Sequence, residues 1–175
     1  MQEGRPGARP ELDEELIAFA GRVFQCARSG DAATLEDLLR QGLPPNLRND
    51  KGDTLVMLAS YHGQPEAVRV LLEHGADPNI LNDRGQMPLG AAAFKGAGEV
   101  VALLLQHGAA VDGCGPDGRT ALMLAAMFNR TEILRQLLAA GADPAARDAA
   151  GHTARMAAEA MGAADTPALL PADPA

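Results

Sequence analysis

The histidines and cysteines of this chain are the side chains best suited to ligate a metal ion or to act as a base or nucleophile. They are His62, His74, His107, His152, Cys26 and Cys114. Only His74 and His107 occupy equivalent places, 33 residues apart and each just before a glycine. Stacked helices lie about 8–10 Å apart, whereas a zinc ligand sits about 2 Å from the metal, so this pair is poorly placed to share one ion. We expect both to be polar residues near helix C-termini.

The two cysteines lie in parts of the chain that are not neighbours in the repeat described below. This separation disfavours a disulfide and agrees with a reducing compartment. Cys114, between Gly113 and Gly115, would be reactive if exposed, but the sequence shows no base near it. We therefore expect two free thiols.

Aspartates are frequent in the segments expected to be loops. They are Asp50, Asp53, Asp77, Asp83 and Asp143. They lack the alternating ligands and the terminal Glu of a calcium-binding loop, and the glycines do not form a phosphate-binding string after a strand. No combination of nucleophile, base and orienting group is recognisable. The sequence therefore predicts no catalytic residue, no metal site and no cofactor, and a protein that is not an enzyme.

The composition limits the classes of partner that the chain can bind. It has 175 residues, a hydrophobic fraction of 47% with only 3% aromatic residues, and a formal net charge of −8. This charge opposes nonspecific binding to nucleic acid or to an anionic membrane surface, because both require clustered Lys and Arg. The first ten residues lack the apolar core of a signal peptide, and no later run is long enough for a membrane span. We expect a cytoplasmic protein with neither nucleic-acid nor membrane partners.

Glycines recur at a period of 33 residues in two columns. The columns are Gly42, Gly75, Gly108 and Gly141, and Gly52, Gly85, Gly118 and Gly151. A constant period of this length indicates a stack of similar units, each of which contacts only its neighbours. Function should then lie on a repeated face rather than in a single pocket.

Each unit contains two apolar segments with the three- and four-residue spacing of helices. The first segment carries a small residue in one column, namely Cys26, Ala59, Ala92, Ala125 and Ala158. The turn between the segments has a residue that tolerates a left-handed backbone in every unit. These residues are Gly30, Gly63, Gly96, Asn129 and Gly162. The pattern predicts helix, turn, helix and loop, repeated.

Several segments resemble the ankyrin repeat. They are Asp-Lys-Gly-Asp-Thr-Leu, Asp-Arg-Gly-Gln-Met-Pro-Leu, Asp-Gly-Arg-Thr-Ala-Leu-Met-Leu-Ala-Ala, and Gly-Ala-Asp-Pro-Asn at 75–79. The resemblance covers residues 11–162, and the chain looks like small bacterial ankyrin proteins. The resemblance implies an all-α solenoid of about four helix-turn-helix repeats joined by hairpin-like loops. The units are expected at about 11–49, 50–82, 83–115 and 116–148, with a partial C-terminal cap at 149–162. Residues 1–10 and 163–175, rich in Pro, Gly and Ala, are expected to be disordered tails.

The chain departs from the family signature T-P-L-H-x-A at two positions. The Pro survives only as Pro88, and the places of the His hold Met57, Gly90, Met123 and Met156. The hydrogen bond between units that the family His implies is therefore lost. We expect contacts of the methionines to replace it in part.

The end of the first helix in each unit supplies a candidate binding face. Two adjacent columns hold Arg28, Tyr61, Phe94, Met127 and Ala160, and Ser29, His62, Lys95, Phe128 and Met161. The family resemblance places them on the concave surface, where residues vary with the partner, and aromatic residues and Met are enriched in interface centres. The alternative is that they pack against the next unit as core. Because Ala and Leu already fill the core columns and Arg28 heads this one, a surface stripe is favoured.

Polar side chains at the loop tips surround this stripe. The candidate partner-binding residues are Tyr61, His62, Phe94, Lys95, Met127 and Phe128, with Lys51, Asp53, Arg84, Gln86 and Arg119 at the rim. An apolar centre with a polar rim is the usual anatomy of a protein interface. The alternative for each single charge is a solvated turn residue.

The sequence thus predicts a non-catalytic protein–protein interaction module, a monomer that binds a partner protein on its concave face. The alternative is a regulatory or protective accessory that inhibits or stabilises one client enzyme, such as an oxidative-stress enzyme. Homodimerisation through the stripe is also left open. No residue pattern in the sequence identifies the partner.

Overall fold

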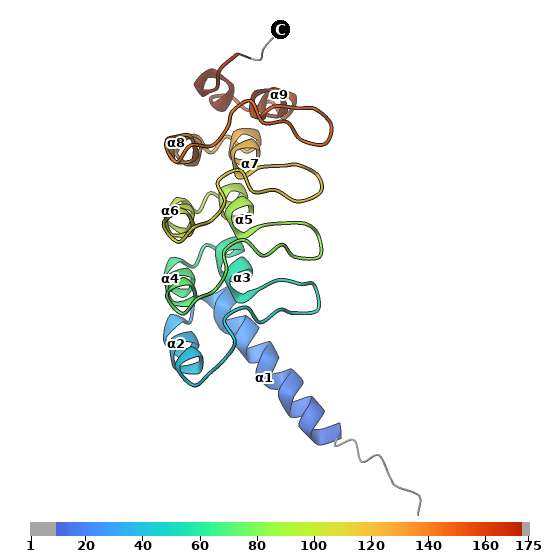
Figure 1. Cartoon of the computed structure of the whole chain (residues 1–175), viewed down its shortest axis with the longest axis vertical. Helices are drawn as coiled ribbons and strands as arrows, with labels where there is room; N and C mark the ends of the chain where they lie inside the picture. The colour runs from blue at the N-terminus through green and yellow to red at the C-terminus, as the bar shows by residue number, and fades with distance from the viewer. Residues whose placement is uncertain (1–9, 173–175) are drawn as a thin grey trace, which may run out of the picture.

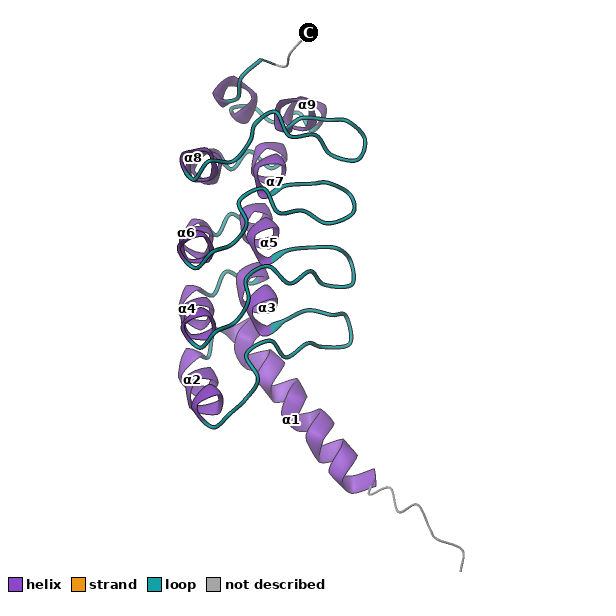
Figure 2. Cartoon of the chain, viewed as in Figure 1, coloured by secondary structure: helices purple, strands orange, loops and turns teal. Residues whose placement is uncertain are grey.

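The computed structural model describes residues 10–172, which form a ladder of short helix pairs (Figure 1). The elements are α1 (Pro10–Ser29), α2 (Ala32–Arg40), α3 (Leu55–Tyr61), α4 (Pro65–Glu73), α5 (Pro88–Lys95), α6 (Gly98–Gln106), α7 (Ala121–Met127), α8 (Thr131–Ala139), α9 (Ala154–Ala160) and the 3-10 turn η1 (Thr166–Leu169). No strand occurs in this part of the chain, where one isolated bridge joins Arg48 and Thr54 (Figure 2). The all-α repeat solenoid predicted from the sequence is confirmed.

The helices form two layers. Helices α3, α5, α7 and α9 stack in an inner layer, and α2, α4, α6 and α8 stack beside them in an outer layer (Figure 1). The long loops that precede α3, α5, α7 and α9 all project to the same side of the ladder. Helix α1 occupies the inner place of the first pair and extends beyond the stack.

The inner helices pack through alanines. Ala59, Ala92, Ala125 and Ala158, which share one column, are each 0% exposed. Side chains this small let consecutive helices lie close together, and leucines of the outer layer such as Leu71 fill the space behind them. The core is therefore built almost without aromatic residues.

The turns between paired helices have a left-handed backbone, as the sequence predicts. Gly30, Gly63, Gly96 and Gly162 have φ between 65° and 80°, and Asn129 takes the fourth of the five turns with φ of 56°. The side chain of Asn129 has a second role, because its Oδ1 accepts hydrogen bonds from the backbone N–H groups of Asp165 and Thr166.

The prediction that residues 163–175 form a disordered tail is wrong for residues 163–172. Thr166 is 0% exposed and its Oγ1 donates to the carbonyl of Ala126, and Leu170 is 5% exposed. Arg155 also donates to the carbonyl of Leu170. The turn η1 packs on α7, α8 and α9 at the place of a final outer helix, because the end of a stack must be covered. Residues 1–9 and 173–175, also expected to be tails, lie outside the described residues.

A serine hydroxyl is buried in this apolar core without a hydrogen-bond partner. Ser60 of α3 is 0% exposed, and its Oγ finds no hydrogen-bond partner among the described residues. The same column holds Ala27, Ala93 and Ala126 in the other units, each 0% exposed. A hydroxyl buried without a partner lowers stability, since it loses its bonds to water.

We predict that Ser60→Ala raises the free energy of unfolding by about 1 kcal/mol, measured by chemical denaturation. The matched control is Ala93→Ser, which places the same hydroxyl in the next repeat and should lower stability by about 1 kcal/mol or more. A loss of stability in Ser60→Ala would contradict this account.

Candidate functional site

Three aromatic side chains of the inner layer are in contact across consecutive repeats. The rings of Tyr61 and Phe94 are stacked with centroids 6.4 Å apart, and Phe94 meets Phe128 edge to face at 4.7 Å. Lys95 places its Nζ 4.8 Å from the centre of the Tyr61 ring. We call Tyr61, Phe94 and Phe128 the aromatic stripe. The close spacing of the inner helices creates it, because their C-terminal ends lie side by side; Phe128 is one position beyond Met127, the equivalent of Phe94.

The aromatic stripe is accessible as well as packed. Tyr61 is 39% exposed, Phe128 is 36% exposed, and Phe94 between them is half-buried. The side chains therefore contact each other between units, as the core alternative proposed, and still present ring surface outside the core.

A groove of about 360 Å³ runs along this stripe. We call it the aromatic groove, and its lining is Tyr61, Arg84, Gly85, Gln86, Met87, Gly90, Ala91, Phe94, Gly113, Cys114, Gly115, Asp117, Arg119, Leu124, Met127 and Phe128. Of the predicted binding residues, it thus brings together the aromatic stripe with Met127, Arg84, Gln86 and Arg119. These residues come from three consecutive units, so side chains of neighbouring repeats together form one continuous surface.

Gly90 lines the groove at the position where other repeats have a methionine, and Leu124 of the next inner helix lies against it. Met57 and Met123, at the equivalent positions, are 3% and 1% exposed and fill this space in their own units. Gly90 lines the groove with no side chain, and a Cβ there would lie 3.2 Å from Cδ1 of Leu124. The φ of Gly90 is not positive, so the backbone itself does not require glycine.

Met87 is a second departure at the same place. In other repeats, threonines cap the inner helices: Oγ1 of Thr54 accepts from the N–H of Met57, and Oγ1 of Thr120 accepts from Met123. Helix α5 has Met87 at this position and no side-chain cap. The Met87 side chain lies in the groove beside Gly113, where a Cβ would be 2.8 Å from its Sδ and Cε.

The loop before α7 also differs from the other loops. Asn49, Asn82 and Asp148 share one column, and each Oδ1 accepts two backbone N–H bonds, from residues two and four places later. In the unit between those of Asn82 and Asp148, the same column holds Gly115, which has no side chain to accept these bonds. A Cβ at that position would overlap the carbonyl oxygen of Gly85, so the close approach of two loops excludes a side chain here.

A second groove, of about 330 Å³, lies on the other side of Tyr61 and is lined largely by loop residues. Predicted residues that line it include Lys51, His62, Arg84 and Gln86, and Arg28 joins them. Asp53 also borders it but is only 5% exposed. Its carboxylate accepts from Nδ2 of Asn82 at 2.7 Å, so Asp53 joins two loops instead of forming an exposed rim.

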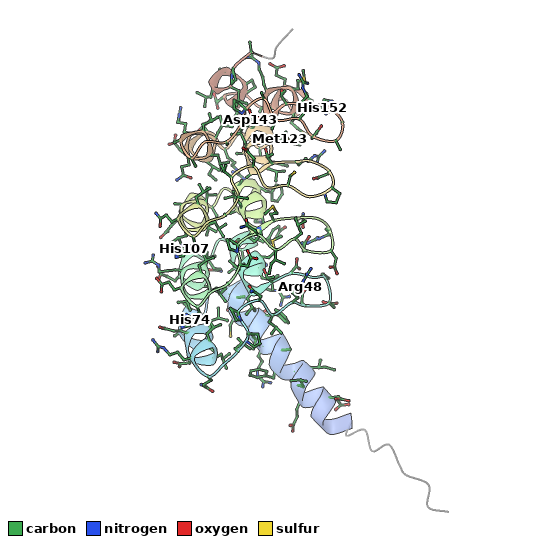
Figure 3. All side chains as sticks on the ribbon, viewed as in Figure 1. Arg48, His74, His107, Met123, Asp143 and His152 are labelled. Atoms are coloured by element: carbon green, nitrogen blue, oxygen red, sulfur yellow. The ribbon has the colours of Figure 1, made fainter. Side chains whose placement is uncertain are left out.

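The side chains that could do chemistry are dispersed. His74 and His107 lie at successive levels of the outer layer (Figure 3), where each Nδ1–H donates to a helix carbonyl, of Val70 and Leu103 respectively. Within residues 10–172, no three His, Cys, Asp or Glu side chains gather as a metal site would require. Burial, and then the charge of Asp31, raise the pKa of the Cys26 thiol, which makes this cysteine a poor nucleophile.

Both cysteines are free thiols, and Cys114 is exposed. No helix among the described residues has the length and apolar character needed to cross a membrane.

Stacked helix pairs with an open groove along the inner helices define a repeat scaffold. The family model for ankyrin repeats in three copies matches residues 23–113 and 60–148. A Pseudomonas aeruginosa protein, named as an ankyrin repeat protein, is 60% identical over 62 residues, which is 35% of this chain and 36% of that protein. The chain thus spans little more than a third of this relative's length. It belongs to the ankyrin repeat family, whose members are protein–protein interaction modules and generally not enzymes.

Sequence reasoning missed several residues that shape the groove. Met87, Gly113, Cys114 and Leu124 were not among the predicted site residues, although all line it. That reasoning identified Gly90 only as a position where the family His, and with it a hydrogen bond between units, is absent. The sequence does contain a signal for them: Met87, Gly90 and Gly115, which differ from the residues at equivalent positions in the other repeats, all belong to the unit 83–115.

Asp148 makes the stability of the loop before α9 depend on pH. The hydrogen bond from the backbone N–H of His152, and a further one from Ala150, lower the pKa of its carboxyl. The unfolded chain has the ordinary value of about 3.9. The bonds therefore stabilise the fold above that pH, and this contribution is lost as the pH falls through the lower folded pKa.

We predict that Asp148→Asn weakens the acid dependence of stability and leaves stability at neutral pH nearly unchanged, because Asn49 and Asn82 make the same bonds without a charge. Urea denaturation between about pH 2 and pH 7 measures this difference. Asp148→Ala, which removes the acceptor, should be less stable at every pH. An Asp148→Asn protein with the pH dependence of the unmodified chain would contradict the assignment.

Proposed function

We propose that this ankyrin repeat protein binds a segment of a partner protein in the aromatic groove, on its concave face. The observation that supports this most is the aromatic stripe, in which the Phe94 ring lies against Tyr61 on one side and Phe128 on the other, and the stripe is still accessible. Aromatic side chains are enriched among the residues that dominate binding energy. In a chain with only five aromatic residues, three of them meet in this groove.

The rim of the groove supplies direction and specificity. Arg84, Gln86 and Arg119 line the same groove as the rings, and Lys51 and His62 line its neighbour on the far side of Tyr61. Rim charges alter association rate and partner choice more than they alter affinity. Rings of the stripe are therefore the anchors, and the rim side chains select among partners.

The apolar part of the groove lining gives it a site for one apolar side chain of the partner. Leu124 lies beside Gly90, Met87 and Met127 line the same groove, and all three are half-buried. Interface centres place such anchors in pockets from which water is excluded.

The first test uses the rings. Tyr61→Ala with Phe94→Ala should weaken binding of a partner captured from the native lysate by at least about 2 kcal/mol, because these side chains are proposed anchors. Calorimetry with the purified partner measures the change, and circular dichroism checks the fold. Arg69→Ala on α4, in the outer layer, is the control. Unaltered affinity of the double variant would reject the aromatic groove as the binding site.

The second test fills the groove and keeps the rings. Gly90→Met introduces the side chain that Met57 and Met123 have, and Leu124 must move by a few tenths of an ångström to admit its Cβ. We expect a folded protein whose affinity for the same partner is at least about tenfold lower. The matched control is Gly98→Met in α6, where a Cβ meets its nearest neighbour, Oε1 of Gln136, at 3.7 Å. Equal loss of binding in both variants would show that the effect does not come from the groove.

A regulatory or protective role toward one client enzyme would use the same surface. It differs from simple tethering only in what binding does to the partner. The activity and heat tolerance of the captured partner, measured with the unmodified chain and with Gly90→Met, distinguish the two roles.

A further inference from the structure

The first half of α1 carries the two most exposed large apolar side chains of the described residues. Leu16 is 65% exposed and Ile17 is 71% exposed. In Figure 1, this part of α1 projects beyond the stack, on the side from which the loops also project. We call residues 13–17 the α1 tip.

The apolar face of the α1 tip continues the face that is buried farther along the same helix. Leu16 and Ile17 precede Val23 and Phe24 by seven residues, two helical turns, so the pairs share one side of α1. Val23 is 1% exposed and Phe24 is 8% exposed. The same amphipathic helix is thus covered by the first repeats over its second half and uncovered over its first half.

The α1 tip is also strongly acidic. Asp13, Glu14 and Glu15 are consecutive and exposed, and the next cation along the helix is Arg22. None of the ion pairs found within residues 10–172 includes these three carboxylates. Acids favour a helix N-terminus in any protein, but that preference does not account for the two exposed aliphatic side chains beside them.

The grooves have the opposite character. Four cationic side chains line them, Arg28, Lys51, Arg84 and Arg119, and Lys95 lies against the Tyr61 ring. The acids in the linings are Asp50, Asp117 and the buried Asp53, whose carboxylate is occupied by asparagine side chains. In a chain with a formal net charge of −8, this face is therefore a local excess of positive charge around exposed rings.

We propose that the α1 tip of one copy docks into the aromatic groove of a second copy. Leu16 and Ile17 contact the aromatic stripe, and Asp13, Glu14 and Glu15 face Arg84 and Arg119. This inference rests on the proposed function, since it uses the same groove. Each copy carries one tip and one groove, so two copies that exchange tips close into a pair. Such a small contact gives weak, reversible association, and it competes with the partner for the groove.

Sedimentation equilibrium of the full chain tests this proposal, from about 5 μM to about 500 μM, where weak contacts dissociate. At low salt, the average mass should rise with concentration above the 18.1 kDa of one chain, and it should fall back at about 0.5 M salt, which screens charges. Leu16→Ser with Ile17→Ser should weaken association at least about tenfold. The matched control is Met161→Ser, which removes the exposed apolar side chain at the other end of the stack and should change nothing.

Charge reversal tests the pairing itself. Glu14→Lys with Glu15→Lys should be monomeric, and so should Arg84→Glu with Arg119→Glu, whereas an equimolar mixture of these two variants should associate again. A chain that stays monomeric throughout the range, or tip variants that associate like the unmodified chain, overturns the proposal. The proposed function is judged separately by Gly90→Met and the captured partner. If the unmodified chain is monomeric and its tip variants lose that partner, the tip belongs to the partner interface and self-docking is wrong.

Discussion

Close packing of consecutive inner helices through alanines determines the arrangement of the aromatic stripe. Because Ala59, Ala92 and Ala125 have no exposed surface, each inner helix lies directly beside the next. Residues two or three positions farther along then lie beside the end of the next helix, which places Tyr61 against Phe94, its equivalent, and Phe94 against Phe128 of the adjacent column. Larger side chains in the alanine column would separate the helices and divide the aromatic stripe. The core and the candidate binding surface therefore share one constraint.

The regular repeat builds the scaffold, and its exceptions build the groove. The unit 83–115 differs from its neighbours at three positions. Met87 replaces the threonine that caps the inner helix, Gly90 replaces the buried methionine, and Gly115 replaces the Asn or Asp whose Oδ1 accepts the two backbone N–H bonds of the loop. All three line the aromatic groove. A uniform stack would fill this space with buried side chains, as the neighbouring units do with Met57 and Met123. The substitutions leave the stacking intact, because the alanine and leucine columns of this unit are retained.

The sequence predicts the fold well because the interactions that build it are local and repeated. The left-handed turns, including Asn129, and the inner alanines follow from residue type and spacing alone. The C-terminal segment was mistaken for a tail, since its composition hides a specific contact: Thr166 reaches the carbonyl of Ala126, forty residues earlier. The burial of Asp53 was also missed, because its asparagine partner lies in the next loop. Contacts between units that occur only once carry no periodic signal.

The central claim is that the aromatic groove, and not the outer layer, is the binding surface. Amide chemical shifts of the isotopically labelled chain, followed as a captured partner is added, test it most directly. The account predicts that the largest changes occur at Tyr61, Gly90, Phe94 and Phe128, which line the groove on three consecutive inner helices. Changes confined to α4, α6 and α8, with the groove amides unaffected, would contradict it.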